Sequence, residues 1–294
     1  MIENTQFGPI YTLTIFREDG TGVEIRSPAY IAFSISLDRL SQPNEASITL
    51  CNLNDEMRAS IGNNEFALVR LEFGYEQANN VAIIFEGRIR RAIASQISND
   101  GILTRIVAGE GELAFRRATI EHSFAQGTTL TEMARFVISQ VDGITEGDLS
   151  GLDGQQLGSQ WVAMGSIRKL FDDMSEQTNS RWSIQRTSLD FVSNDIASDL
   201  FPVTRKTFET GLIDASLDEN GIDAVFLLDP AIKPNGTLEI VSNSASTTGF
   251  WRIDSVVHEG EFGSGSSFRT TITGQRRDGV GRVAGQDERA TFAS

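Results

Sequence analysis

The sequence predicts a mainly β protein in which two similar small β-barrels flank a small α/β module with two helices. Three observations predict this arrangement. Short alternating segments fill the first third, the apolar period becomes helical in the middle third, and strand signals return in the last third. The chain has 294 residues, 39% hydrophobic and 22% charged, enough for two or three packed cores. We expect the first barrel at 1–112, the module at 113–190, the second barrel at 191–278 and a flexible tail at 279–294.

The first third shows the alternation of half-buried strands. Phe33, Ile35 and Leu37 alternate with serines, and similar segments are separated by Gly, Asn and Asp turn signals. Many short strands of this kind favour a small barrel. The expected strands are residues 11–16, 23–25, 33–37, 46–50, 67–75, 81–91 and 102–108, with a short helix at 55–61.

The middle third carries two helical stripes. Thr129-Leu130-Thr131-Glu132 is a capping box, which predicts a helix start. The apolar stripe that follows consists of Leu130, Met133, Ala134, Val137, Ile138 and Val141. A second helix is expected from Ser166, with its stripe at Ile167, Leu170, Phe171 and Met174. A strand at 181–185 completes the module.

Strand signals return in the last third, at residues 222–228, 237–241, 250–257 and 268–273. Pro230 and Pro234, on either side of Lys233, predict a rigid turn between two of these strands. The Gly- and Ala-rich segment after Arg277 is expected to be a flexible tail or a partner-binding arm.

A weak internal repeat links the first and last thirds. Leu71-Glu72-Phe73, Gly87-Arg88-Ile89 and a segment at 104–109 occur in the same order as Leu238-Glu239-Ile240, Trp251-Arg252-Ile253 and a segment at 270–274. Three short matches can also arise between two unrelated β-meanders, so duplication and coincidence both stay open.

Charge and composition exclude several classes of protein. The net charge of −15 argues against a surface that grips nucleic acid, which needs clustered Lys and Arg. No apolar run is long enough to span a bilayer, and the first residues lack the pattern of a secretory signal, so we expect a soluble protein made in the cytoplasm. Cys51 is the only cysteine, which excludes an intrachain disulfide, and we expect a buried, inert thiol.

The sequence offers little catalytic chemistry. His122 and His258 are the only histidines; neither has a second histidine at metal-ligand spacing, and we expect both at a surface or interface. Phosphate-binding and nucleophile-elbow motifs are absent. The paired carboxylates, which solvated helix faces and turns would also carry, are Asp172-Asp173, Glu110 with Glu112, and Glu259 with Glu261. We therefore predict a protein that is not an enzyme and holds no cofactor or metal.

The order of several segments resembles a known family. In the first third these are Phe33-Ser34-Ile35-Ser36, Asn44-Glu45-Ala46-Ser47-Ile48-Thr49-Leu50 and Ile84-Phe85-Glu86-Gly87-Arg88-Ile89. In the last third the match runs from Thr210-Gly211-Leu212-Ile213 through Leu227-Leu228-Asp229-Pro230-Ala231-Ile232-Lys233-Pro234 to Val256-Val257-His258-Glu259-Gly260-Glu261. Over residues 10–277 the chain resembles the baseplate hub proteins of contractile phage tails. It departs from their pattern at Asn235, inserted before Gly236, at Glu261, where they carry Asp, and at Phe250-Trp251.

The resemblance implies a structural role. Hub proteins are similar to one another in forming a homotrimer of two-barrel subunits with pseudo-sixfold symmetry. Such a trimer adapts a trimeric central spike to a hexameric tail tube or its initiator proteins, with baseplate wedge proteins as further neighbours. DNA would pass through the channel without specific binding. The protein would act in the virion tail baseplate, after assembly in the host cytoplasm. The hub-like part of type VI secretion spike proteins is a related possibility.

Seven residues are candidates for subunit or spike contacts. Phe250 and Trp251 are neighbours on one strand, so only one of them can face the core and the other is a possible intersubunit anchor. Arg88 and Arg252 occupy equivalent positions in the repeat and could pair with acids of adjacent barrels, although solvated strand faces explain them equally well. Pro230, Lys233 and Pro234 form the third candidate contact, against the alternative of an ordinary turn.

Two other functions stay open. A tail-associated peptidoglycan hydrolase would use one of the acidic pairs. A carbohydrate-binding tail module would use Trp161 and Trp182 to stack on sugar rings, although both are more simply core residues of the module.

Overall fold

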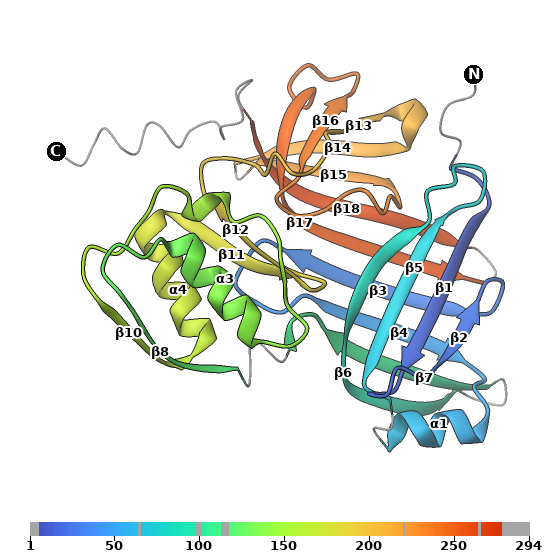
Figure 1. The fold of residues 1–294 in the computed structure, drawn as a ribbon. Coiled ribbons are helices and arrows are strands. Elements are labelled where there is room, and N and C mark those ends of the chain that lie inside the picture. The colour runs from blue at the N-terminus through green and yellow to red at the C-terminus, as the bar shows by residue number, and fades with distance from the viewer. Residues whose placement is uncertain are drawn as a thin grey trace.

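The computed structural model describes residues 6–63, 66–97, 101–112, 118–219, 221–263 and 266–277. Figure 1 shows an extended β structure with a small helical module attached on one side. The expectation of a mainly β chain with an α/β module is confirmed. The boundaries at 112, 190 and 278 stay predictions, and the expected tail at 279–294 lies outside the described residues.

The strands outside the module form two β units. The first unit consists of β1 (Pro9–Phe16), β2 (Gly22–Arg26), β3 (Ile31–Asp38), β4 (Glu45–Cys51), β5 (Leu68–Tyr75), β6 (Ala82–Ile97) and β7 (Gly101–Gly109), with α1 (Asp55–Gly62) between β4 and β5. The second unit consists of β13 (Thr204–Thr207), the 3-10 turn η3 (Phe208–Thr210), β14 (Leu212–Asp218), β15 (Gly221–Leu227), β16 (Thr237–Val241), β17 (Gly249–Phe262) and β18 (Ser267–Arg276).

The two units have the same strand order. Hydrogen bonding places the strands of the first unit in the order β3-β4-β7-β6-β5-β1, with β2 added beyond β1. The second unit has the order β14-β15-β18-β17-β16-β13, which matches the first position by position along the chain. One direction differs, because β13 runs parallel to β16 whereas β1 runs antiparallel to β5. The weak repeat in the sequence therefore corresponds to a common topology.

A bulge fixes how the two units align. The register shifts between Ile89 and Arg91 where β6 pairs β7, and between Ile253 and Ser255 where β17 pairs β18. Aligned on these bulges, Arg88 corresponds to Arg252, as the sequence predicts. The next strands then match as well, because Thr104 of β7 corresponds to Thr270 of β18 and both hydroxyls are buried.

One part of the expected alignment is wrong. The sequence match pairs Leu71 with Leu238, but the residue opposite Arg88 is Leu68 and the residue opposite Arg252 is Thr237. Val69 is therefore the counterpart of Leu238. A shift of two residues leaves the same side chains on the same face of a strand, so the apolar pattern could not detect it.

The two units share one sheet and one apolar core. The second half of β17 pairs antiparallel with β3, residues 255–262 against 31–38, and we call this pairing the junction. Across the core, the ring of Phe73 on β5 lies 6.2 Å from Phe33 on β3 and 5.0 Å from Phe268 on β18. Buried side chains of both units belong to the same hydrophobic cluster.

The α/β module has a core of its own. Its elements are β8 (Thr119–Phe124), α3 (Leu130–Gln140), β9 (Thr145–Glu146), the 3-10 turn η2 (Ser150–Leu152), β10 (Trp161–Ser166), α4 (Ile167–Thr178), β11 (Ser180–Gln185) and β12 (Ser188–Ser193). The predicted capping box starts α3, with the Thr129 and Glu132 side chains each bonded to the backbone of the other. In the part of the chain that the structure describes, no helix is long and apolar enough to cross a bilayer.

Two expectations about single residues are wrong. Cys51 is half-buried rather than buried, because the inward positions of β4 are Ala46, Ile48 and Leu50. His258 is 1% exposed and lies on the inner face of β17, where its Nδ1 is 2.9 Å from the Thr270 hydroxyl. Burial lowers the pKa of His258 to about 4, so the ring is neutral at pH 7.

Candidate assembly interface

The seven candidate residues divide into buried and accessible members. Trp251 is 2% exposed, and its indole N–H donates to the Thr247 carbonyl at 3.0 Å. Its neighbour Phe250 is 43% exposed, so of the two aromatic residues Trp251 faces the core and Phe250 the surface. Arg88 is partly exposed and pairs with Glu18 at 2.7 Å within the same unit.

Arg252 belongs to a buried polar cluster that joins three parts of the chain. Its Nε donates to Asp254 at 2.8 Å and its Nη1 to the Asn194 carbonyl, just after β12, at 2.5 Å. Arg39, which follows β3, donates to the same Asp254 and to the Ser193 carbonyl, at 3.3 Å and 3.1 Å. Burial, with Arg252 close by, lowers the pKa of Arg39 to about 10. The cluster fixes the module against both β units at the end of the junction.

The proline turn is also anchored inside the chain. Pro230 and Pro234 are buried, and Lys233 is half-buried with its ammonium 5.6 Å from the centre of the Phe201 ring. At the start of this turn, Asp229 forms a buried ion pair with Lys206 of β13 at 2.6 Å. Accessible surface among the seven candidates is therefore provided mainly by Phe250 and Arg88, with part of Lys233.

A second buried polar cluster holds the module against the first β unit. Glu110 is 1% exposed and accepts from the Asn44 amide at 2.7 Å and from the backbone N–H of Arg186 at 2.8 Å. The Gln185 amide donates to the Asp38 carbonyl at 2.7 Å. Burial raises the pKa of Glu110 to about 7, because desolvation outweighs these hydrogen bonds.

The other carboxylates that the sequence groups in pairs also have partners within the chain. Glu112 pairs with Arg90 at 2.8 Å, and Asp173 with Lys169 at 2.9 Å. On the outer face of β17, Glu261 accepts from the Tyr30 hydroxyl at 3.3 Å. Among the described residues, no group of three or more His, Cys, Asp or Glu side chains could hold a metal ion.

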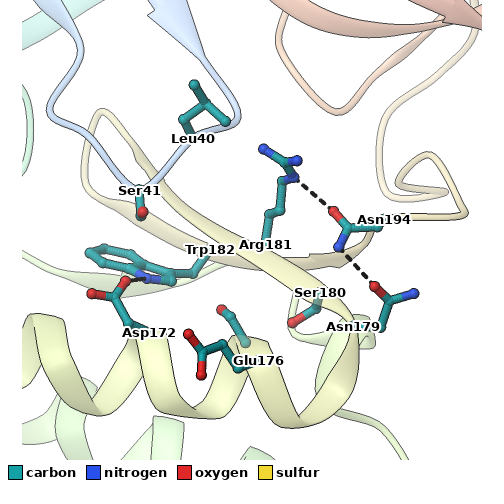
Figure 2. Close-up of a pocket in the computed structure, with 10 residues that line it drawn as sticks. Leu40, Ser41, Asp172, Glu176, Asn179, Ser180, Arg181, Trp182 and Asn194 are labelled. Carbon is teal, nitrogen blue, oxygen red and sulfur yellow. Dashed lines mark hydrogen bonds between the residues drawn. The ribbon is translucent and has the colours of Figure 1, made fainter.

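A pocket lies between α4, the start of β11 and the β3–β4 loop. Its volume is about 490 Å³, and Figure 2 shows Arg181, Asn194 and Asn179 linked by hydrogen bonds along one side. Trp182 donates its indole N–H to Asp172 at 2.7 Å. The Trp182 side chain is only 2% exposed, so it does not present the open ring face on which a sugar stacks.

The Trp182–Asp172 bond gives a direct test of the module core. Replacing Asp172 by Ala should lower the free energy of unfolding by about 1–2 kcal/mol, because a buried indole N–H loses its acceptor. Urea unfolding followed by tryptophan fluorescence measures this loss. Asp173→Ala is the matched control, since its partner Lys169 is exposed, and it should leave stability within experimental error. Equal losses in the two variants would contradict the assigned role of Asp172.

The outer face of the continuous sheet is polar. Around the junction it carries many small hydroxyl residues with interspersed charges, together with the apolar Ala32 and Val257. The polar members are Ser34, Ser36, Ser47, Thr49, Arg105, Ser255, Glu259, Glu261, Arg269, Thr271 and Thr273. Several of these contact one another, such as Ser255 with Thr273 at 2.7 Å and Arg105 with Ser47 at 2.8 Å. The opposite face of the same strands covers the apolar core.

Comparison with known proteins gives matches at the level of structure alone. No family model and no curated protein sequence matches the chain. A tail protein from Neisseria meningitidis superimposes with a TM-score of 0.63 at 8% identity, over 91% of this chain and 96% of its own. A 43 kDa tail protein of prophage MuSo2 from Shewanella oneidensis gives 0.60 at 9% identity, over 91% and 98%.

The chain has the fold of these tail proteins. A component of the E. coli type VI secretion system, itself described as similar to the bacteriophage T4 tail proteins gp27 and gp5, also shares this phage tail fold. It superimposes with a TM-score of 0.55 at 12% identity, over 85% of this chain and 74% of its own. The tail-protein fold that the sequence motifs imply is therefore present.

Proposed function

We propose that this chain is the structural baseplate hub of a contractile phage-type tail. Three copies form a ring of six β units, which adapts a threefold central spike to a sixfold tail tube. The observation that supports this proposal most directly is the presence of two β units with one strand order in a single chain. A trimer of such chains has exact threefold and approximate sixfold symmetry, the combination that an adapter between these partners requires.

The proposed ring implies a set of partners. The spike lies below the ring, the tail tube or its initiator proteins lie above it, and baseplate wedge proteins contact its outside. Phe250, Arg88 and the exposed part of Lys233 are the candidate contacts to subunits or spike. The buried candidates act indirectly. Trp251 and Arg252 hold the strand that carries Phe250, and Pro230 and Pro234 hold the turn that carries Lys233.

The channel carries DNA without binding it specifically. The acidic chain, with a net charge of −15, repels phosphate overall, and the polar outer face of the sheet offers hydroxyl groups and few cations. In this role the protein does no catalysis and acts in the tail baseplate of the virion after assembly in the host cytoplasm.

Light scattering on the purified full chain tests the proposal. At micromolar concentration we expect three times the mass of one chain, and negative-stain images should show rings with six lobes. Incubation with purified peptidoglycan should release no fragments. A strict monomer across micromolar concentrations, or cell-wall turnover that disappears when an acidic pair is changed, would overturn the proposal.

A further inference from the structure

In the part of the chain that the structure describes, the boundary between the module and the β units contains no shared apolar core. The buried apolar side chains of the module form one cluster, and those of the β units form another. Three cavities, of about 490, 280 and 190 Å³, lie along this boundary, and each is lined by residues from both sides. A boundary with this much open space is not close-packed like a protein core. The module can therefore change its angle without breaking an apolar core.

One buried polar cluster lies where the chain leaves the module. Arg39 and Arg252 donate to the carbonyls of Ser193 and Asn194, and both also donate to Asp254. Arginine stays charged between pH 5 and 8, even Arg39, whose pKa burial lowers to about 10. We call this set of residues the hinge cluster, because its arginines hold the backbone at the exit of the module throughout this range.

The other buried polar cluster lies where the chain enters the module. Glu110, just after β7, accepts from the Asn44 amide at 2.7 Å and from the backbone N–H of Arg186, in the β11–β12 turn, at 2.8 Å. The Gln185 amide donates to the Asp38 carbonyl at 2.7 Å. We call this set the latch cluster. It contains a group that titrates near neutrality, since burial raises the pKa of Glu110 to about 7.

The charged groups around Glu110 come from both β units and from the module. On β6, the backbone N–H of Glu86 donates to the Glu110 carboxyl at 3.5 Å. The Arg186 guanidinium attracts ionised Glu110, but it is itself partly buried, which lowers its pKa. Asp190 of β12 and Lys233 of the second unit line the 190 Å³ cavity together with Glu110. Ionised Glu110 is therefore solvated poorly while the boundary is closed, and water that enters on opening solvates it better.

We infer that the module is a hinged domain, held closed at Glu110 in acid and free to rotate about the hinge cluster when Glu110 loses its proton. Figure 1 shows the module attached on one side of the sheet, where such a rotation would open the boundary. Because the chain crosses the boundary at both clusters, the module rotates but stays attached. Every residue involved lies in one chain, so this inference does not depend on the ring proposed above.

The coupling between the proton and the rotation sets the size of the effect. The Glu110 carboxyl has a pKa of about 7 in the closed state, whereas a solvated glutamate titrates near 4.3. The closed state thus binds the proton more tightly, and raising the pH favours the open state. The ratio of open to closed molecules should rise on the order of 10²-fold between pH 5 and pH 8.

Amide hydrogen exchange of the full chain measures this opening. Protection factors compare each amide with its unprotected exchange rate at the same pH. The protection factor of the Arg186 amide, whose N–H bonds to Glu110, should fall on the order of 10²-fold from pH 5 to pH 8 in the wild type and stay constant in Glu110→Gln. The matched control Asp190→Asn removes another buried carboxyl from the same cavity and should keep the wild-type fall.

The core of the module is the internal reference. The buried amides of α4 should exchange at least about tenfold more slowly than the Arg186 amide at both pH values, because the module rotates as a folded unit. Equal protection at the two places would mean that the module leaves the β units only by unfolding, and would overturn the inference. A pH-independent protection factor at Arg186 in the wild type overturns it too. So does a pH dependence that Asp190→Asn abolishes and Glu110→Gln keeps.

A covalent tether tests the rotation without changing Glu110. In the full chain with Cys51→Ser, the pair Glu18→Cys and Asp142→Cys lies on opposite sides of the 280 Å³ cavity beside the latch cluster. Joining the two thiols with a short bismaleimide should return the protection factor of the Arg186 amide at pH 8 to its value at pH 5. The same variant before cross-linking is the reference.

A second tether, on the other side of the module, is the matched control. Ser41 and Glu176 face each other across the 490 Å³ cavity beside the hinge cluster (Figure 2). Joining Ser41→Cys to Glu176→Cys should leave the fall in protection unchanged, because displacements close to a hinge are small. Equal effects of the two tethers, or no effect of either, would reject the rotation.

Discussion

Replacing Asp229 by Asn is expected to destabilise the second β unit by about 3–5 kcal/mol, the cost of leaving a buried charge without its partner. The Lys206 side chain is 2% exposed, and its ammonium lies 2.6 Å from the Asp229 carboxylate. The same ammonium also donates to the Thr210 carbonyl at 3.1 Å, but a neutral carbonyl cannot replace the lost opposite charge.

The double variant Lys206→Met with Asp229→Asn shows whether the loss of stability comes from the unpaired charge of Lys206. Removing both charges leaves an apolar side chain of similar length at 206, and most of the lost stability should return. Urea unfolding at one fixed protein concentration, followed by circular dichroism, measures all variants. Glu146→Gln, which breaks an exposed pair with Arg135, is the control and should have no measurable effect. If the double variant is as unstable as Asp229→Asn, the ion pair is not the cause.

Raising the pH from 5 to 8 is expected to weaken the docking of the module through Glu110. Burial raises the pKa of Glu110 to about 7 in the folded chain, whereas an unfolded glutamate titrates near 4.3. As the pH rises, the Glu110 carboxyl keeps its proton longer in the folded chain than in the unfolded chain. Its contribution to the free energy of unfolding is therefore fully present below the pKa of the unfolded state and is lost as the pH rises through the pKa of the folded state. The loss between pH 5 and 8 amounts to about 2–3 kcal/mol.

Glu110→Gln isolates this effect. The amide keeps an oxygen acceptor for Asn44 and for the Arg186 N–H but cannot ionise. The free energy of unfolding of the variant minus that of the wild type should therefore rise with pH by the same amount. Asp190, with its pKa raised to about 6, and His258, lowered to about 4, titrate in both proteins and cancel in the difference. Parallel pH profiles would show that Glu110 does not ionise with a shifted pKa.

Much of the secondary structure could be predicted from local pattern. The alternation of Phe33, Ile35 and Leu37 gave β3, and the Thr129–Glu132 capping box gave the start of α3. The short strands β8 and β10 were missed, because β8 alternates over only six residues and β10 carries exposed apolar side chains at Val162 and Met164. β13 and β14 were missed because β13 contains no apolar residue and the side chains of β14 are largely exposed, so neither strand has a clear apolar pattern.

The candidate contacts could be predicted only in part. Alternation along the strand requires one of Phe250 and Trp251 to face outward, but it does not say which. In the structure Trp251 faces inward, where the Thr247 carbonyl accepts a hydrogen bond from its indole N–H. His258 and Arg252 look like surface residues in the sequence, yet both are buried. Each has a polar partner that makes its burial possible: the Thr270 hydroxyl for His258 and the Asp254 carboxylate for Arg252. The alternation of apolar residues predicts neither contact.

The sequence by itself determined most of the strands, the helical stripes and the presence of a repeated meander, because these depend on residues close together in the chain. Only the tertiary structure decided the register of that repeat and the pairing of β17 with β3, residues more than 200 positions apart. Such long-range pairing depends on which strand edges remain unpaired once each unit has folded.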